Sequence, residues 1–345
     1  TGPAPVPSPR GVPSPRGVRS PRGVRSPRGV RDPRDLSIPP VRTPNRPRPN
    51  GISVRVPEVA EHIIRLLNRH LSGYEVRTVE RLGEGQDNAV YEVNGELVIR
   101  QSKAEAPDER REAVEREAAL LMVVSDLSPL PVPRPMFVDE EAGVFAYRKL
   151  PGRPLKFHPV KEPACLAAPL GDFLSRLHTA PVERMEAFVP RDIYPLSELR
   201  EEAEGHYRDI VAQVPPTARR QIEKFLAAES PPDPDQETLT FCHNDLGSEH
   251  LLVDVEASAL TGVIDWTDAA IADPAYDLAL VFRDLGPEIY ERTLAHYEGS
   301  HDDTGHERAV FYARCALLED IAYGLRTGIR PYADAGLAHL GHTFA

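Results

Sequence analysis

Hydrophobic and polar residues first form a regular pattern at about residue 56. In the run PEVAEHIIRLLNRHL, residues 57–71, apolar side chains recur every three or four positions, which predicts an amphipathic helix. Three strand-like runs follow, at residues 74–82, 89–93 and 96–101. The dipeptide Asn94-Gly95 joins the last two runs and favours a tight hairpin, because both of its residues tolerate positive φ. The pattern therefore predicts a helix followed by a meander of antiparallel strands.

The pattern changes near Leu150. Before this point a helix is predicted over residues 108–125, with two more strands at residues 136–140 and 143–150. After it the period is mainly helical, at residues 165–180, 197–214 and 216–230, and helical stretches near 287–298 and 305–327 close the chain. Between them, residues 238–282 combine short β-branched runs with loops rich in Asp and His. We therefore predict a small lobe with five antiparallel strands and a larger, mostly helical lobe.

The first 50 residues have a different composition. They consist of SPRGV repeats and further Pro-rich and Arg-rich sequence. Such a segment offers almost no apolar surface to bury, so it is predicted to be disordered. It is either a basic arm for an anionic surface or a dispensable extension, including translated sequence upstream of the true start; we favour the extension. The start of the chain also lacks the apolar stretch of a secretory signal.

Charge is divided unevenly along the chain. Residues 1–50 hold eleven Arg, no Lys and two Asp, a net +9, and the remaining 30 basic and 51 acidic side chains give the rest −21. A part this acidic repels nucleic acid and attracts cations, so we expect a cationic ligand and no nucleic-acid partner. No run approaches the roughly 20 apolar residues of a membrane span, and a cytoplasmic monomer is expected. The spacing of Cys165, Cys242 and Cys315 indicates buried free thiols, without a disulfide or a zinc site.

The segment FCHNDLGSEHLLVD contains the strongest candidate for chemistry. A polar loop with His243, Asp245 and His250 lies between two β-rich runs, so its side chains can converge on one site. Downstream, Asp265 ends the apolar run GVIDW. A carboxylate in such a place requires a metal ion or hydrogen-bond donors, because an uncompensated buried charge is costly.

These residues resemble the signature of the aminoglycoside and macrolide phosphotransferases, a branch of the protein-kinase-like superfamily. That signature reads His-x-Asp, then Asn or His five residues after the Asp, then Ile-Asp-Trp or Ile-Asp-Phe, then Asp-Pro and a further Asp. The matching residues are His243-Asn244-Asp245, His250, Ile264-Asp265-Trp266, Asp273-Pro274 and Asp277.

The resemblance implies a role for each of these residues. Asp245 would be the base that accepts the proton of the attacking hydroxyl, and His250 and Asp265 would hold Mg²⁺ against the nucleotide. Protein kinases have Asn where His250 stands, whereas some aminoglycoside and macrolide kinases have His. His243 and Asp277 would support the loop. Trp266, which follows Asp265, is expected in the core.

The small lobe extends the resemblance. Gly83 and Gly85 would let a loop approach the phosphates closely. Arg100 would take the position of the phosphate-pairing Lys of protein kinases, with Lys103 as its substitute if Arg100 faces away. The acidic partner of Arg100 would be Glu117, in preference to Glu115. The backbone around Arg148–Leu150 would bind the purine edge at the hinge between the lobes.

We therefore expect a bilobal α+β fold of the protein-kinase-like type. Its segments would be a disordered tail at residues 1–50, a nucleotide-binding lobe at 51–150 and a catalytic and substrate-binding lobe at 151–345. The expected reaction is Mg²⁺-dependent transfer of the γ-phosphate of ATP or GTP to a hydroxyl of a small molecule, with an aminoglycoside-type antibiotic preferred. Macrolides, amino sugars or amino alcohols are the alternative substrates, and a non-catalytic nucleotide-binding protein is the alternative function.

Substrate choice would be determined by the helical insert between Phe157 and Asp235. Two acid-rich segments, SELREEAEG and PPDPDQE, lie at residues 197–205 and 231–237. They either line a pocket for amino groups or form solvated helix faces.

Overall fold

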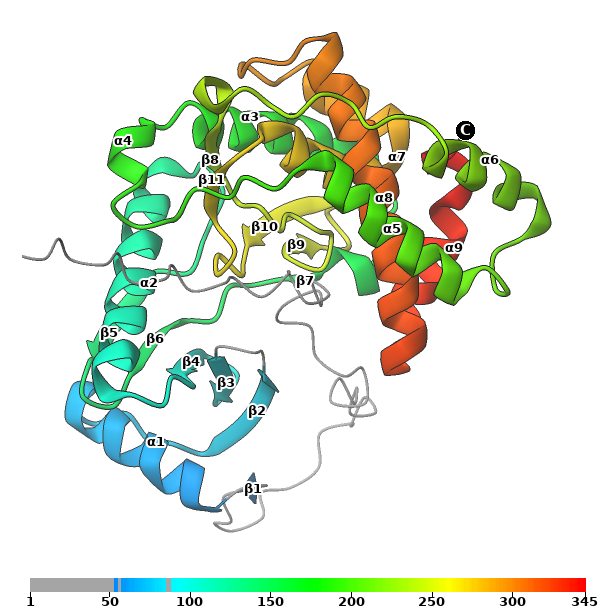
Figure 1. Cartoon of the computed structure of the whole chain (residues 1–345). Coiled ribbons are helices and arrows are strands. Elements are labelled where there is room, and N and C mark those ends of the chain that lie inside the picture. The colour runs from blue at the N-terminus through cyan, green and yellow to red at the C-terminus, as the bar shows by residue number, and fades with distance from the viewer. Residues whose placement is uncertain (1–52, 55–56, 85–87) are drawn as a thin grey trace, which may run out of the picture.

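The small lobe is built on a six-stranded sheet in the order β1-β2-β3-β4-β6-β5 (Figure 1). This computed structural model describes residues 53–54, 57–84 and 88–345, so the tail at residues 1–50 lies outside the described residues. The five predicted antiparallel strands are present. A sixth, β1, pairs in parallel with β2; its two residues are too few to show a sequence period. The strands are β1 (Ser53–Val54), β2 (Thr78–Glu84), β3 (Asn88–Val93), β4 (Leu97–Ser102), β5 (Pro135–Asp139) and β6 (Val144–Arg148).

The hairpin between β3 and β4 forms at the predicted dipeptide. Asn94 and Gly95 have φ of 55° and 73°, the positive values that this turn requires. The Asn94 side chain also joins the turn to β2, because its Oδ1 accepts the backbone N–H groups of Arg77 and Thr78 at 2.8 and 3.0 Å.

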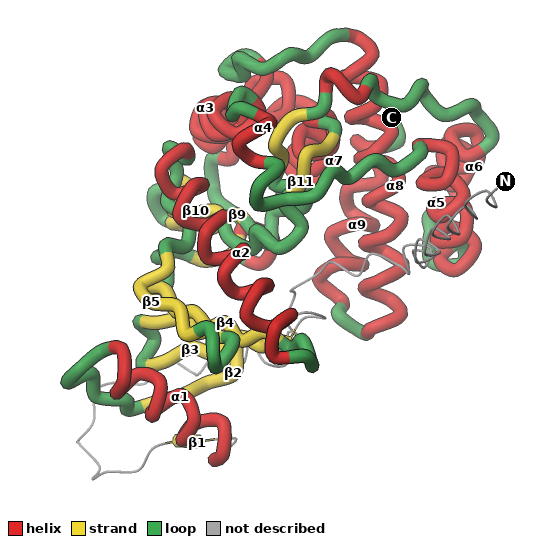
Figure 2. The backbone as a smooth tube through the Cα atoms, turned by 60° about the vertical axis from the view of Figure 1, so that its left-hand side comes forward, coloured by secondary structure: helices red, strands yellow, loops and turns green. Residues whose placement is uncertain are grey.

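The two faces of the sheet are covered by different helices. Leu97 and Ile99 of β4 pack with Ile63 and Leu67 of α1 (Pro57–His70). Val98 belongs instead to the large core that includes α2 (Pro107–Leu127), which extends from the sheet to the large lobe (Figures 1 and 2). Since successive side chains of a strand point to opposite faces, Arg100 shares the α2 face with Val98. The alternation in β4 thus directs Arg100 away from α1 and toward α2.

The large lobe is mostly helical. Its helices are α3 (Ala167–His178), α4 (Val182–Met185), α5 (Leu196–Ile210), α6 (Pro216–Leu226), α7 (Pro274–Leu294), α8 (Asp303–Thr327) and α9 (Arg330–Thr343), with short 3₁₀ turns η2 (Leu155–Phe157), η3 (Pro163–Leu166) and η4 (Gln236–Thr238). The predicted stretch near 287–298 corresponds to the second half of α7, which bends where Gly286 has φ of 81° and Pro287 follows.

The sequence pattern missed α9, so the prediction that residues 305–327 close the chain is wrong. The helix is rich in Ala and Gly, and small residues give a weak hydrophobic period. It is held by close packing instead. A β-carbon on Gly324 of α8 would lie 2.4 Å from the backbone nitrogen of Ala333, and one on Gly336 of α9 would lie 2.5 Å from Ile321 Cγ1. Glycine at both positions lets the two helices approach.

Two small sheets support the loops of the large lobe. One has the order β10-β9-β7 and the other pairs β11 with β8. Their strands are β7 (Arg153–Pro154), β8 (Thr240–Cys242), β9 (Leu251–Asp254), β10 (Ala259–Val263) and β11 (Ala270–Ala272). The polar loop of residues 243–250 therefore spans the gap between a strand of each sheet, and we call it the catalytic loop after the role that the family resemblance implies for it.

All three cysteines are free, and two of them, Cys242 and Cys315, are buried as predicted. The prediction is wrong for Cys165, which is exposed because it lies in the surface turn η3. No helix in the described part of the chain combines the length and the apolar composition needed to cross a bilayer.

Candidate active site

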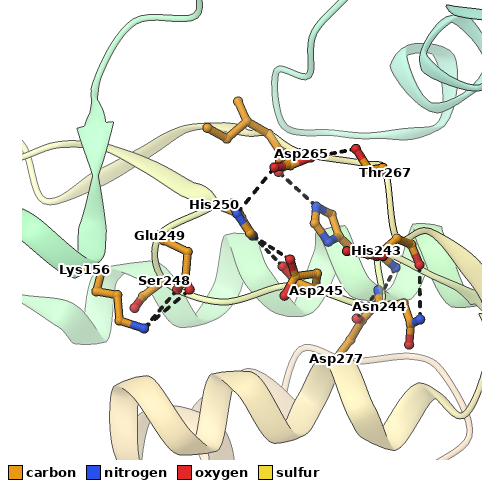
Figure 3. A network of polar contacts seen from close by, with 12 residues as sticks. Lys156, His243, Asn244, Asp245, Ser248, Glu249, His250, Asp265, Thr267 and Asp277 are labelled. Carbon is orange, nitrogen blue, oxygen red and sulfur yellow. Dashed lines mark hydrogen bonds and ion pairs between the residues drawn. The ribbon is translucent and has the colours of Figure 1, made fainter. Parts of the chain in front are cut away.

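The first half of the catalytic loop is fixed to the first turn of α7. Asp277 is fully buried there, and its two carboxylate oxygens accept the backbone N–H groups of His243 and Asn244 at 2.9 and 2.8 Å (Figure 3). Asn244 has φ of 60°, so the chain turns sharply just before Asp245. The prediction that Asp277 supports the loop is confirmed.

Asp277→Asn is expected to lower the free energy of unfolding by about 3 kcal/mol, because one buried N–H group would lose its acceptor and face an amide donor. Urea denaturation would measure the change. Asp254→Asn, at an exposed carboxylate whose Oδ1 accepts two turn N–H groups, is the control and should change the value by no more than about 0.5 kcal/mol. An equal effect of both substitutions would contradict the buried anchor.

His250 is oriented by the loop itself. Its Nδ1 donates to the backbone oxygen of Asp245 at 2.7 Å, and the Asp245 carboxylate lies 3.5 Å from the same nitrogen. The other ring nitrogen, Nε2, faces Asp265 Oδ2 at 3.8 Å, as Figure 3 shows. This Nε2 is buried, and no residue in the described ranges forms a hydrogen bond with it. The pair of Nε2 and a carboxylate oxygen fits a divalent cation that displaces the Nε2 proton, because a neutral imidazole nitrogen and a carboxylate oxygen can both act as ligands.

Asp265 is held in a strained conformation. Its φ is 64°, which is rare for a residue with a β-carbon and persists where surrounding contacts fix it. Thr267 Oγ1 donates to Asp265 Oδ1 at 2.9 Å, and Arg100 Nη1 lies 3.5 Å from the same oxygen. Burial alone would raise the pKa of Asp265, but Arg100 and His250 outweigh it and lower the pKa.

The small lobe contributes Arg100 to the same site. Arg100 Nε lies 2.7 Å from Glu117 Oε1 of α2, and Arg100 Nη2 donates to Thr267 Oγ1. The predicted partner, Glu117, is therefore the acid of α2 that Arg100 contacts, besides Asp265. Arg100 connects the sheet, α2 and the segment after Asp265 in one chain of polar contacts.

Burial and neighbouring charges together shift the pKa values of Asp245 and His250. Burial raises the pKa of Asp245 to about 7, with His250 opposing the shift. Burial would lower the pKa of His250, but Asp245 and Asp265 outweigh it and raise the pKa to about 9. A carboxyl group with a pKa near 7 is well matched to accepting a proton at neutral pH.

His243 and Trp266 belong to the frame of the site. Burial lowers the pKa of His243 to about 4, so its ring is neutral, and Nε2 donates to the backbone oxygen of Ile264 at 3.1 Å. Trp266 is 2% exposed, with its ring 4.6 Å from that of His243. Both agree with the supporting roles expected for them.

Not every predicted site residue is brought to this centre. Gly83 lies at a register shift in the β2–β3 pair, and Gly85 lies outside the described residues. Arg148 is exposed at the end of β6, and Leu150 is partly buried. Between them, the Lys149 N–H is used by the Glu96 backbone oxygen at 2.8 Å. The glycine-loop and hinge assignments stay predictions.

A small pocket adjoins the catalytic loop on the side of Asn244. It is lined by polar and aromatic residues from four separate segments: Asp192, Tyr194, Asn244, Asp273, Tyr276 and Tyr312. The acid-rich segments of the insert contribute Leu199 and Pro234 to its wall. Asn244 Nδ2 donates to Asp192 Oδ2 at 3.0 Å, a contact between residues 52 positions apart that no sequence motif indicated.

The sequence analysis also did not identify Thr267 as a site residue. Its position two residues after Asp265 could have indicated that its hydroxyl lies near the Asp265 carboxylate.

A second group of possible metal ligands is less suited to a cation. His178, Cys242 and Asp277 place one ligand atom each within 4.8 Å of the others. However, both Asp277 oxygens already accept loop N–H groups, and His178 Nδ1 bonds to the Tyr297 hydroxyl at 2.7 Å. These contacts make the group part of the loop's support.

Three known proteins show what the chain is similar to. Viomycin phosphotransferase from Streptomyces vinaceus is 29% identical over 206 residues, 58% of this chain and 70% of that protein. The GDP complex of an aminoglycoside 2'-phosphotransferase-IIIa has a TM-score of 0.59 at 23% identity, over 82% of this chain and 98% of that one. The macrolide 2'-phosphotransferase apoenzyme from Brachybacterium faecium has a TM-score of 0.54 at 26% identity, and the match covers 82% of this chain and 98% of that one. The bilobal kinase-like fold is thereby confirmed.

The match to a family profile covers most of the two lobes. Residues 78–312 match the phosphotransferase enzyme family, and this range includes Arg100, Asp245, His250 and Asp265. The resemblance inferred from the loop residues is confirmed, and the chain belongs to the phosphotransferase enzyme family.

Proposed function

We propose that this phosphotransferase uses Mg²⁺ and ATP or GTP to phosphorylate a hydroxyl of a cationic small molecule, with an aminoglycoside-type antibiotic as the preferred class. The observation that supports it most is the convergence of Asp245, His250 and Asp265 beside Arg100. Phosphoryl transfer requires positioning and charge neutralisation more than covalent chemistry, and these four residues supply both.

In this proposal each residue acts on a defined atom. Asp245 accepts the proton of the acceptor hydroxyl and orients its oxygen toward the γ-phosphate. Deprotonated His250 Nε2 and the Asp265 carboxylate would hold the cation, which would neutralise charge on the phosphate oxygens. Arg100 contacts both Glu117 and Asp265, and in this proposal it pairs with phosphate, for which a guanidinium is well shaped. As the family resemblance implies, we assign the remaining nucleotide contacts to the backbone around Arg148–Leu150 and to the glycines Gly83 and Gly85.

The surroundings of the catalytic loop favour a cationic acceptor. Asp268 raises the pKa of Asp245, so its negative charge acts at the base. Asp192 and the tyrosines Tyr194 and Tyr276 line the neighbouring pocket. Carboxylates and aromatic faces both attract ammonium groups. The relatives named for viomycin and aminoglycosides support the same class.

The direct test is nucleotide consumption by the purified protein. Mg-ATP and Mg-GTP would be supplied separately, with aminoglycosides, viomycin, macrolides and small amino alcohols as acceptors. Strong stimulation by a cationic acceptor, with a phosphorylated product seen by mass spectrometry, is expected. Stimulation by macrolides alone would favour the alternative that the Brachybacterium likeness supports. Nucleotide binding without turnover on any acceptor would contradict the proposed reaction.

A further inference from the structure

Five charged side chains form a buried cluster beneath the second half of the catalytic loop. They come from η2, the loop, α7 and α8, and each side chain is at most 8% exposed: Lys156, Glu249, Arg283, Asp284 and Asp320. Lys156 Nζ lies 2.9 Å from Asp320 Oδ2 and 3.3 Å from Glu249 Oε2. Arg283 Nε lies 2.7 Å from Asp284 Oδ1. We call this set the buried charge cluster.

The buried charge cluster holds the catalytic loop through hydrogen bonds to the loop backbone as well as through the Glu249 side chain. Asp284 Oδ2 accepts the Ser248 N–H at 2.7 Å, and the Ser248 carbonyl accepts the backbone N–H of Lys156 at 3.1 Å. Figure 3 shows Lys156, Ser248 and Glu249 on one side of Asp245, and Asp277 and Asn244 on the other. The loop is therefore fixed at two points, with the base between them and His250 directly after the second.

Gly247 allows Glu249 to reach the cluster. A β-carbon at position 247 would lie 2.4 Å from Glu249 Oε2 and 3.1 Å from Arg283 Nη2. Any larger residue would push the Glu249 carboxylate off Lys156, although Gly247 itself has no positive φ that would require glycine. Glycine is thus required at position 247 because the Glu249 carboxylate occupies the space that a β-carbon would need.

We propose that Glu249 is a positioning residue, which acts through the buried charge cluster to fix the geometry of Asp245 and His250. A buried set of charges is a weak source of stability compared with apolar packing, because desolvation offsets the attraction. The buried charge cluster instead holds the loop in a single geometry. The Glu249 carboxylate is neutralised by both Lys156 and Arg283 in only one position. This inference rests on the proposed function for its kinetic test.

A double-mutant cycle between Gly247 and Glu249 tests the inference. Gly247→Ala and Glu249→Ala are each expected to lower kcat by about 10–100-fold, the usual effect of removing an outer-shell partner. The KM for the acceptor should stay within about twofold. The double variant should be no slower than Glu249→Ala alone, because the severe overlap is with the carboxylate, and the contact that remains, Arg283 Nη2 at 3.1 Å, is relieved by a small shift of that side chain. Glu249→Gln, which keeps the shape, should recover part of the activity.

The variants are expected to fold. Without Glu249, two cations and two carboxylates remain in the buried charge cluster, so no unpaired charge is left. Glu256→Ala removes an exposed carboxylate that pairs with Lys161, and it should leave kcat unchanged. Multiplying losses in the double variant, or unchanged kcat in both single variants, would overturn the proposal.

A second readout separates this inference from the proposed function. Trp266 is the only Trp of the chain, so its fluorescence follows unfolding in urea without any turnover. Gly247→Ala should lower the urea midpoint in the native background and leave it unchanged in the Glu249→Ala background. Equal shifts in both backgrounds would overturn the placement of Glu249, even for an active enzyme. A wild-type protein that is silent on every acceptor would instead count against the proposed function.

Discussion

Asp245→Asn is expected to lower kcat by about 10²–10⁴-fold, because an amide cannot accept the proton of the attacking hydroxyl. Nucleotide affinity should be retained. His250 contacts the backbone oxygen of residue 245, and this contact does not depend on the side chain. The variant should therefore separate the chemical step from binding. Steady-state kinetics with the best acceptor, together with calorimetric titration of Mg-nucleotide, would measure the two effects.

Asp254→Asn is the control for this experiment as well, since Asp254 is an exposed carboxylate at the far end of β9. Its kcat should equal that of the native protein. If Asp245→Asn turns over at a near-native rate, another group accepts the proton. If it loses nucleotide binding too, the residue belongs to the metal site and not to the acceptor side.

The local parts of the fold and site were predictable from the sequence. The β-rich run ELVIRQ located a strand, the family signature singled out Arg100 on it, and the hairpin dipeptide fixed the register of β3 and β4. The catalytic loop and its anchor were also within reach, because Asp245, Asp265 and Asp277 follow one another at the spacing of a known signature. In each case the information lies within a few tens of residues.

The parts that could not be predicted depend on packing between distant segments. Lys156 and Asp320 are 164 residues apart, and neither residue has a local pattern that marks it as buried. Charged residues are normally exposed, so a cluster of five would be read as surface. Helix α9 was missed for a related reason, since Gly324 and Gly336 stabilise its packing through close approach and not through an apolar stripe.

Asp265→Asn is expected to make nucleotide affinity independent of Mg²⁺ and to lower kcat/KM by about 10³-fold, since metal neutralisation contributes several kcal/mol to such reactions. The substitution removes the negative charge that faces His250 Nε2 at 3.8 Å. An amide in that place is uncharged and is a much weaker ligand for Mg²⁺ than a carboxylate. The remaining oxygen could still accept from Thr267, so the fold should be preserved. Nucleotide titrations with Mg²⁺ and with a chelator would measure the change.

Asp268→Asn is the matched control for the metal site. Asp268 lies three residues further along and acts on Asp245 through its charge, so its substitution should leave the Mg²⁺ dependence of nucleotide affinity intact. Its effect should appear instead in the KM for a cationic acceptor, which would rise. If Asp265→Asn keeps the native Mg²⁺ dependence, His250 and Asp265 are not the cation ligands. The strained backbone of Asp265 would then only place its carboxylate in contact with Arg100 and Thr267.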